Sequence, residues 1–170
     1  MKDFFDLAKE RFSCRSYDST PLTDDEINKL LSAAKLAPTA CNRQPFTLLV
    51  VRGESLKKIQ NCAWLYGAPL AIVVCTNESE AWQRKYDRQN FAVVDGAIVM
   101  THMLLQAADM ELGSCFIGAI KTDLLTEALE IKEPLRAQFI MVAGHMASDV
   151  KPDKLHFERK DLKDQVIYLN

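Results

Sequence analysis

The chain has 170 residues, of which 48% are hydrophobic and 26% charged, and its formal net charge is −2 at pH 7. These values are typical of a globular protein with one hydrophobic core, and we expect a single domain over residues 1–170. A nearly neutral chain has no general attraction for nucleic acid or for an anionic membrane, so neither is an expected partner.

The five cysteines argue against both a metal site and a disulfide framework. They lie far apart in the sequence, and none forms a C-x-x-C pair of the kind that binds zinc. The N-terminal segment, MKDFFDLAKERF, carries charges throughout and lacks the apolar stretch of a signal peptide. We therefore predict a cytoplasmic protein without a bound metal.

The N-terminal part begins with a short amphipathic helix at residues 3–10 and continues as a loop over 11–22. Thr23 and Glu26 then have the spacing of a capping box, which predicts that a helix begins at Thr23. Helical periodicity continues as far as Pro38, which ends the helix.

The remaining elements are predicted from apolar runs bounded by turn residues. They are a loop at 38–46, a strand at 47–51, a helix at 54–62, a buried strand at 70–75, a long helix at 91–112, a helix at 122–130, a strand at 139–143 and a possible strand at 165–169. Residues 114–118 form too short a run for an element of their own. Helices dominate, which predicts an α+β fold with a small central sheet.

The long helix at 91–112 is apolar and nearly long enough to span a bilayer. Its polar residues are Asp95, His102, Gln106 and Asp109. Their spacings of seven, four and three place them on one helical face, and acidic groups are costly in lipid. We expect a helix buried on most sides, with one polar stripe and Gly113 as its C-cap. A helix this apolar needs more cover than a single small chain easily provides, which also indicates a subunit interface.

Three loops and one tail segment carry residues that could bind a ligand. Arg11, Ser13 and Arg15 follow the first helix and could contact a phosphate, or could form a solvated basic turn near a helix end. Asn42 and Gln44, in the loop PTACNRQP, could contact the edge of a heterocycle, or could only stabilise a turn.

The segment GSCFIG at 113–118 has a glycine at each end, which permits close backbone approach to a ligand or simply a tight strand entry. Cys115 has no histidine near it in sequence, so we expect a buried thiol and not a nucleophile. Arg159 and Lys160 belong to a charged tail that is long for a compact domain and is expected to reach onto a partner subunit.

Taken together and in this order, these segments resemble the FMN-dependent nitroreductase family. The Arg-x-Ser-x-Arg motif followed by an aromatic residue is matched by Arg11, Ser13, Arg15 and Tyr17. The Pro-Ser-x-x-Asn-x-Gln-Pro loop is matched by residues 38–45, the acidic residue of the long helix by Asp95, the Gly-(Ser/Thr)-Cys-Trp-Ile-Gly motif by residues 113–118, and the basic C-terminal stretch by Arg159 and Lys160. Phe116 departs from the pattern, since it replaces the usual tryptophan.

The resemblance implies an FMN-dependent NAD(P)H oxidoreductase that passes hydride through flavin N5 to an acceptor such as a nitroaromatic or a quinone. It also implies a homodimer with a mixed central sheet flanked by helices, a long interface helix and exchanged C-terminal arms. Two alternatives remain: a flavin-binding redox module, and a specialised member that fragments flavin or removes halogen.

The resemblance also implies which residues bind the cofactor. Arg11, Ser13 and Arg159 would hold the phosphate and ribityl chain, and Arg15 would lie near the N1/O2 edge of the flavin. Backbone amides at residues 117–118 would lie near N5, and the loop at 38–44 would come from the other subunit. The complete predicted set is Arg11, Phe12, Ser13, Arg15, Pro38, Thr39, Ala40, Asn42, Gln44, Cys115, Ile117, Gly118 and Arg159. No protein acid or base is expected, because the flavin performs the chemistry.

Overall fold

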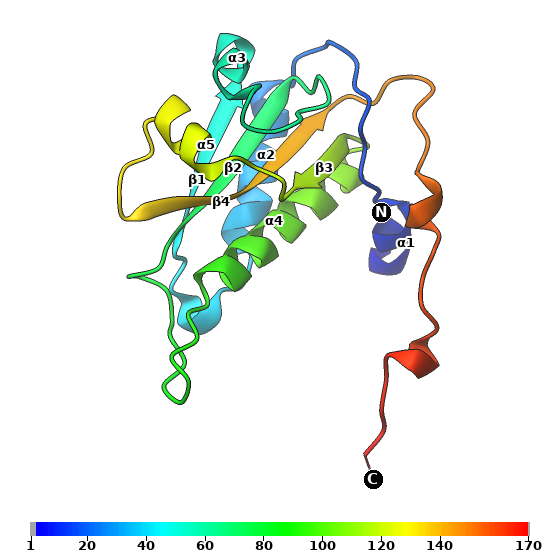
Figure 1. Cartoon of the computed structure of the whole chain (residues 1–170). Helices are drawn as coiled ribbons and strands as arrows, with labels where there is room; N and C mark the ends of the chain where they lie inside the picture. The colour runs from blue at the N-terminus through cyan, green and yellow to red at the C-terminus, as the bar shows by residue number, and fades with distance from the viewer. Residues whose placement is uncertain (1–2, 170) are drawn as a thin grey trace.

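The computed structural model describes residues 3–169 and is built around a four-stranded sheet (Figure 1). The strands lie in the order β1-β2-β4-β3, and every neighbouring pair is antiparallel. Their bounds are Phe46–Arg52 for β1, Leu70–Asn77 for β2, Gly113–Ile117 for β3 and Leu135–Gly144 for β4. The α+β class is confirmed, but the mixed sheet is wrong. Within the described chain, the segment parallel to β3 forms one bridge, between Ser13 and Ser114, and no strand.

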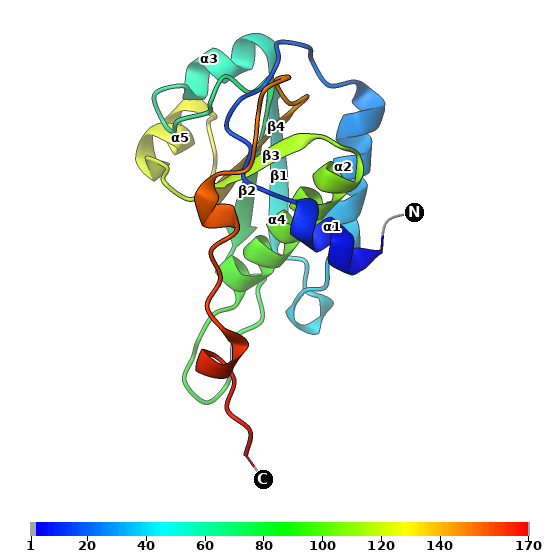
Figure 2. The same cartoon turned by 90° about the vertical axis from the view of Figure 1, so that its right-hand side faces the viewer.

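Helices cover both faces of the sheet (Figures 1 and 2). They are α1 (Phe4–Glu10), α2 (Asp24–Leu36), α3 (Leu56–Ile59), α4 (Ala92–Asp109) and α5 (Thr122–Ala128). Side chains alternate across a strand, so the fully buried β2 contributes to two cores. Leu70, Ile72 and Val74 pack in the core with α2 and α4, whereas Ala71, Val73 and Cys75 pack in the core with α3 and α5.

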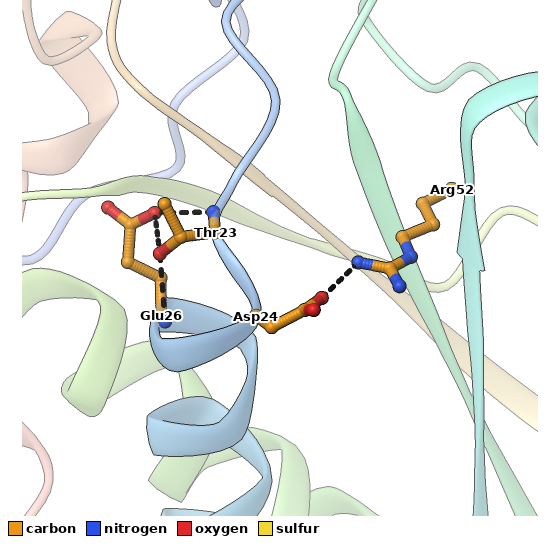
Figure 3. A network of polar contacts seen from close by, with 4 residues as sticks. All are labelled: Thr23, Asp24, Glu26 and Arg52. Carbon is orange, nitrogen blue, oxygen red and sulfur yellow. Dashed lines mark hydrogen bonds and ion pairs between the residues drawn. The ribbon is translucent and has the colours of Figure 1, made fainter.

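The predicted capping box is present at the start of α2 (Figure 3). The Thr23 hydroxyl accepts a hydrogen bond from the Glu26 backbone N–H, and the Glu26 carboxylate accepts one from the Thr23 N–H at 2.7 Å. These bonds satisfy backbone donors that a helix start leaves without partners. Asp24 forms an ion pair with Arg52, the last residue of β1, which ties the start of the helix to the sheet.

The long helix α4 ends at Asp109, so the prediction of Gly113 as its C-cap is wrong. Glu111 adopts the left-handed conformation after the helix, with φ 58°, and Gly113 is already the first residue of β3. The prediction that residues 114–118 are too short for an element is also wrong. Pairing with β4 makes residues 113–117 a strand, and that partner is distant in sequence.

The outward face of α4 is apolar. Val93 and Val94 are 44% and 39% exposed, and a groove of about 460 Å³ runs along this face. It is lined by Val93, Val94, Ala97, Ile98, Thr101 and His102. The predicted polar stripe is wrong in part, because Asp95 points into the protein and is 1% exposed. In the described part of the chain, no helix has the length and apolar character needed to cross a membrane.

Two further elements differ from the predictions. The helix expected at 54–62 is reduced to a 3₁₀ turn at Gly53–Ser55 followed by the four residues of α3. The strand expected at 139–143 extends over Leu135–Gly144, because it pairs with the whole length of β2. Pairing with β2 thus determines the length of β4, which the apolar run alone underestimates.

Beyond β4 the chain forms a C-terminal arm, residues 147–169, which passes α1 and then extends away from the body of the molecule (Figures 1 and 2). It contains 3₁₀ turns at Lys154–His156 and Leu162–Asp164. The predicted strand at 165–169 is absent, because no other strand of the chain lies beside it. Its apolar side chains Ile167, Tyr168 and Leu169 are at least 85% exposed.

Candidate functional site

The segment from Arg11 to Arg15 lies beside the first residues of β3. Ser13 forms a parallel bridge with Ser114, and the Cys14 N–H donates to the Ser114 carbonyl at 2.8 Å. A Cβ atom at Gly113 would lie 2.6 Å from Sγ of Cys14, so only glycine allows the two segments to approach this closely. Two segments that are distant in sequence are therefore in direct backbone contact.

The first part of the C-terminal arm lies against the same segment. Nε2 of His156 donates a hydrogen bond to the Lys9 carbonyl at 3.0 Å, and its ring meets the Phe12 ring edge-on with centroids 6.3 Å apart. The Arg159 guanidinium donates to the carbonyls of its own segment, at Leu155 and Glu158. His156 therefore fastens the arm to the end of α1.

These contacts form a pocket of about 250 Å³, which we call the arginine pocket. It is lined by Arg11, Phe12, Ser13, Arg15, Asp153, Leu155, His156 and Arg159. Three arginines face one carboxylate, that of Asp153, whose Oδ1 already accepts a hydrogen bond from the Leu155 N–H. Guanidinium groups present forks of donors that match phosphate oxygens, so the pocket is suited to a phosphate monoester.

Arg15 lies between the arginine pocket and a loop at residues 62–68. Its Cζ atom is 5.9 Å from the centroid of the Tyr66 ring. A side-chain hydrogen bond with Tyr66 is the main influence that raises the pKa of Arg15. Arg15 also acts on Cys115. Burial raises the pKa of this thiol, and Arg15 and the Ser13 hydroxyl oppose that effect only in part, so Cys115 remains a neutral thiol.

The backbone at the end of β3 is open to a ligand. A Cβ atom at Gly118 would meet nothing within 4 Å, so a flat ring can lie directly against this backbone. The turn that follows Gly118 is joined to the loop at 62–68, because the Lys121 N–H donates to the Cys62 carbonyl at 2.8 Å. β3 therefore leads from the arginine pocket to an open backbone surface.

The loop at 38–44 is folded by its own side chains. The Thr39 hydroxyl accepts a hydrogen bond from the Gln44 backbone N–H at 3.0 Å, and Gln44 Nε2 donates to Asn42 Oδ1 at 3.2 Å. Cys41, Asn42 and Gln44 all have φ near 51°, in the left-handed region. Asn42 is exposed, and its side-chain N–H groups donate no hydrogen bond within the described residues, so they are available to a ligand.

This loop and the arginine pocket lie at opposite ends of α4. The Ala40 N–H donates to the carboxylate of Asp95, in the first turn of the helix, whereas Arg11–Arg15 adjoins Gly113, just beyond its last turn. The helix has 18 residues and is about 27 Å long. One chain therefore brings together Arg11, Ser13, Arg15, Cys115 and Arg159, but holds the loop at 38–44 away from them.

Sequence reasoning missed three residues of this region. Tyr66, Asp153 and His156 belong to no motif, and each lies in a segment that periodicity describes as turn or tail. Their positions depend on contacts between distant segments, so no local pattern could have indicated them.

The chain matches a family model described as the nitroreductase family over residues 8–64 and 60–145. An Archaeoglobus fulgidus protein, whose name refers to NADH dehydrogenase and NAD(P)H nitroreductase, is 28% identical over 94% of this chain and 99% of its own length. The Bacillus subtilis protein named FMN reductase [NAD(P)H] is 26% identical, over 100% of this chain and 76% of its own. The crystal structure of a nitroreductase family protein from Clostridium difficile superposes with a TM-score of 0.93 at 32% identity, covering 99% of each chain.

Proposed function

This chain belongs to the nitroreductase family, and we propose that, as an FMN-dependent NAD(P)H oxidoreductase, it passes hydride to a nitroaromatic or quinone acceptor. When bound, FMN would supply hydride transfer at its N5 atom. The protein's part is to bind the cofactor, orient it and place charge near it.

The observation that carries this proposal is the arginine pocket. The pocket lies at the start of β3, and the open backbone at Gly118 lies at its end. In that order, these surfaces suit the phosphate, the ribityl chain and the flat ring of FMN. Arg11, Ser13 and Arg159 would bind the phosphate, with Phe12 packed beside them. Each hydrogen bond from a charged donor contributes about 1.5–3 kcal/mol.

Arg15 would place a cation at the N1/O2 edge of the flavin, where reduction adds negative charge. A positive group fixed at that edge favours reduction electrostatically. Ile117 and Gly118 would offer backbone N–H groups near N5, and Cys115, two residues before Ile117 on β3, would pack as a neutral thiol beside the ring.

The site is completed by a second copy of the chain. Because α4 separates the loop at 38–44 from the arginine pocket by about 27 Å, one cofactor cannot reach both within a single chain. A two-fold axis across the apolar outward face of α4 places the helices antiparallel and brings the loop of one copy to the pocket of the other. Pro38, Thr39, Ala40, Asn42 and Gln44 would then line the isoalloxazine from the partner.

The C-terminal arm supports the same assembly. Its exposed apolar end is uncovered in a single chain, and it extends away from the body where a second copy could receive it (Figure 2). We place the dimer, with one cofactor-binding domain per chain, in the cytoplasm. All five cysteines are free thiols, which is the usual state in a reducing compartment.

The visible spectrum of the purified protein tests the proposal. We expect flavin absorption that bleaches anaerobically on addition of NADH or NADPH and returns on addition of a quinone or a nitroaromatic. A protein that binds FMN but is not bleached would be a binding module and would contradict the proposed activity. A colourless protein that takes up no added FMN would contradict the cofactor as well.

A further inference from the structure

We infer that Tyr66 is a positioning residue, which fixes the Arg15 guanidinium in the direction that the flavin edge requires. This inference rests on the proposed function, because it concerns the cation that the proposed function assigns to the N1/O2 edge. Tyr66 lies outside every motif that led to the family, and its suggested role comes only from its contacts in the structure.

The first observation is the contact itself. The Cζ atom of Arg15 lies 5.9 Å from the centroid of the Tyr66 ring, within the range of a cation–π contact. The Tyr66 side chain is also the largest influence that raises the pKa of Arg15. The Asp153 carboxylate raises the pKa of Arg15 through its charge, and by less than Tyr66 does. The Tyr66 ring thus restricts how the guanidinium can lie, whereas a nearby charge acts on it without a preferred orientation.

The second observation is that Tyr66 is itself held in place. Its φ of 56° and the 71° of Gly67 are both in the left-handed region, which costs a tyrosine free energy and persists only where the surrounding structure requires it. The loop is pinned by the bond from Lys121 to Cys62, and the Trp64 ring meets the Tyr66 ring edge-on with centroids 6.4 Å apart. The body of the protein therefore sets the position of the ring.

An arginine side chain is long and loses much rotamer entropy when it is fixed. Charge aids a reaction most when it is already oriented before the reaction occurs, because no reorganisation is then needed. Tyr66 would therefore act by restricting Arg15, and removing only its hydroxyl should leave the charge present but less well directed.

A double-mutant cycle with Tyr66→Phe and Arg15→Ala tests this inference in the full-length protein loaded with FMN. Tyr66→Phe keeps the ring and removes the hydroxyl. We expect it to slow flavin reduction at saturating NAD(P)H by about two- to tenfold, the range for one hydrogen bond. We also expect a lower midpoint potential of the bound flavin, with an unchanged dissociation constant for FMN and an unchanged melting temperature.

In the Arg15→Ala background, Tyr66→Phe should have no further effect on the reduction rate or on the potential. Tyr86→Phe, which removes a hydroxyl from a ring that is 97% exposed, is the matched control and should change neither quantity. Equal effects of Tyr66→Phe in the two backgrounds would overturn the inference, as would a change confined to melting temperature or FMN affinity. Wild-type protein that binds no FMN would instead overturn the proposed function, and the inference with it.

Discussion

The buried carboxylate of Asp95 accepts a hydrogen bond from the backbone N–H of Ala40 at 2.9 Å, across 55 positions of the sequence. Its second oxygen, Oδ2, is buried and has no hydrogen-bond partner among residues 3–169. The bond fastens the loop at 38–44, with its three left-handed residues, to the first turn of α4. The shape of the loop therefore depends on a side chain of the helix.

Replacing Asp95 by alanine should weaken FMN binding. The loop would lose its attachment to α4, and we expect the dissociation constant for FMN to rise by about tenfold, since a hydrogen bond to a charged group contributes about 1.5–3 kcal/mol. Quenching of FMN fluorescence on titration measures this constant, and urea unfolding monitors the fold. Asp95→Asn keeps an oxygen acceptor for Ala40 and should bind FMN within about threefold of wild type. Unchanged affinity in Asp95→Ala would show that the attachment does not matter.

The arginine pocket predicts a distinction between FMN and riboflavin, which lacks the phosphate. Arg11→Ala should weaken FMN binding by roughly ten- to a hundredfold while riboflavin affinity changes little. Parallel titrations with the two ligands measure the difference. Lys160→Gln removes a neighbouring charge that does not line the pocket, so both affinities should be retained. An equal loss for both ligands in Arg11→Ala would place the phosphate elsewhere.

The apolar outward face of α4 predicts the oligomeric state. Val94→Glu places a charge in the groove of that face, and we expect it to convert the dimer to a monomer and to lower FMN affinity at the same time. Leu124→Glu is the matched control, because Leu124 is also partly exposed, at 45%, but lies on α5. Sedimentation velocity at micromolar concentration measures the mass. A Val94→Glu dimer with normal FMN content would contradict the proposed interface.

The capping box predicts a dependence of stability on pH. Hydrogen bonds from the Thr23 N–H and hydroxyl hold the pKa of Glu26 below its ordinary value of 4.5. Because the pKa is lowered in the folded state, the stabilisation is present at neutral pH and is lost as pH falls through the folded pKa. Glu26→Gln should cost about 0.5–1 kcal/mol in urea unfolding at pH 7, and much less at pH 3. A cost that is equal at both pH values would exclude this linkage.

Features that depend on neighbouring residues were predicted well. The start of α2 follows from Thr23 and Glu26, because a capping box is formed by residues three positions apart. The buried strand β2 follows from its continuous apolar run, which needs no knowledge of what covers it. The arginines of the candidate site were found because they belong to motifs.

Features that depend on distant contacts were not predicted. Gly113 was assigned to a helix cap because glycine favours the left-handed conformation, but Glu111 adopts it and Gly113 is required by the closeness of Cys14. Tyr66 could not be found because its contact with Arg15 joins two loops without a shared pattern. The inward direction of Asp95 is determined by the N–H of Ala40, which lies far away in the chain.

The length of α4 has a genetic consequence. In the proposed dimer, each cofactor site takes the loop at 38–44 from one chain and the arginine pocket from the other. A substitution in the loop and a substitution in the pocket of the same chain therefore affect different sites. A subunit with Asn42→Ala and a subunit with Arg11→Ala would each form inactive homodimers. Their mixed dimer would contain one fully intact site and one doubly defective site, so two inactive alleles would complement each other.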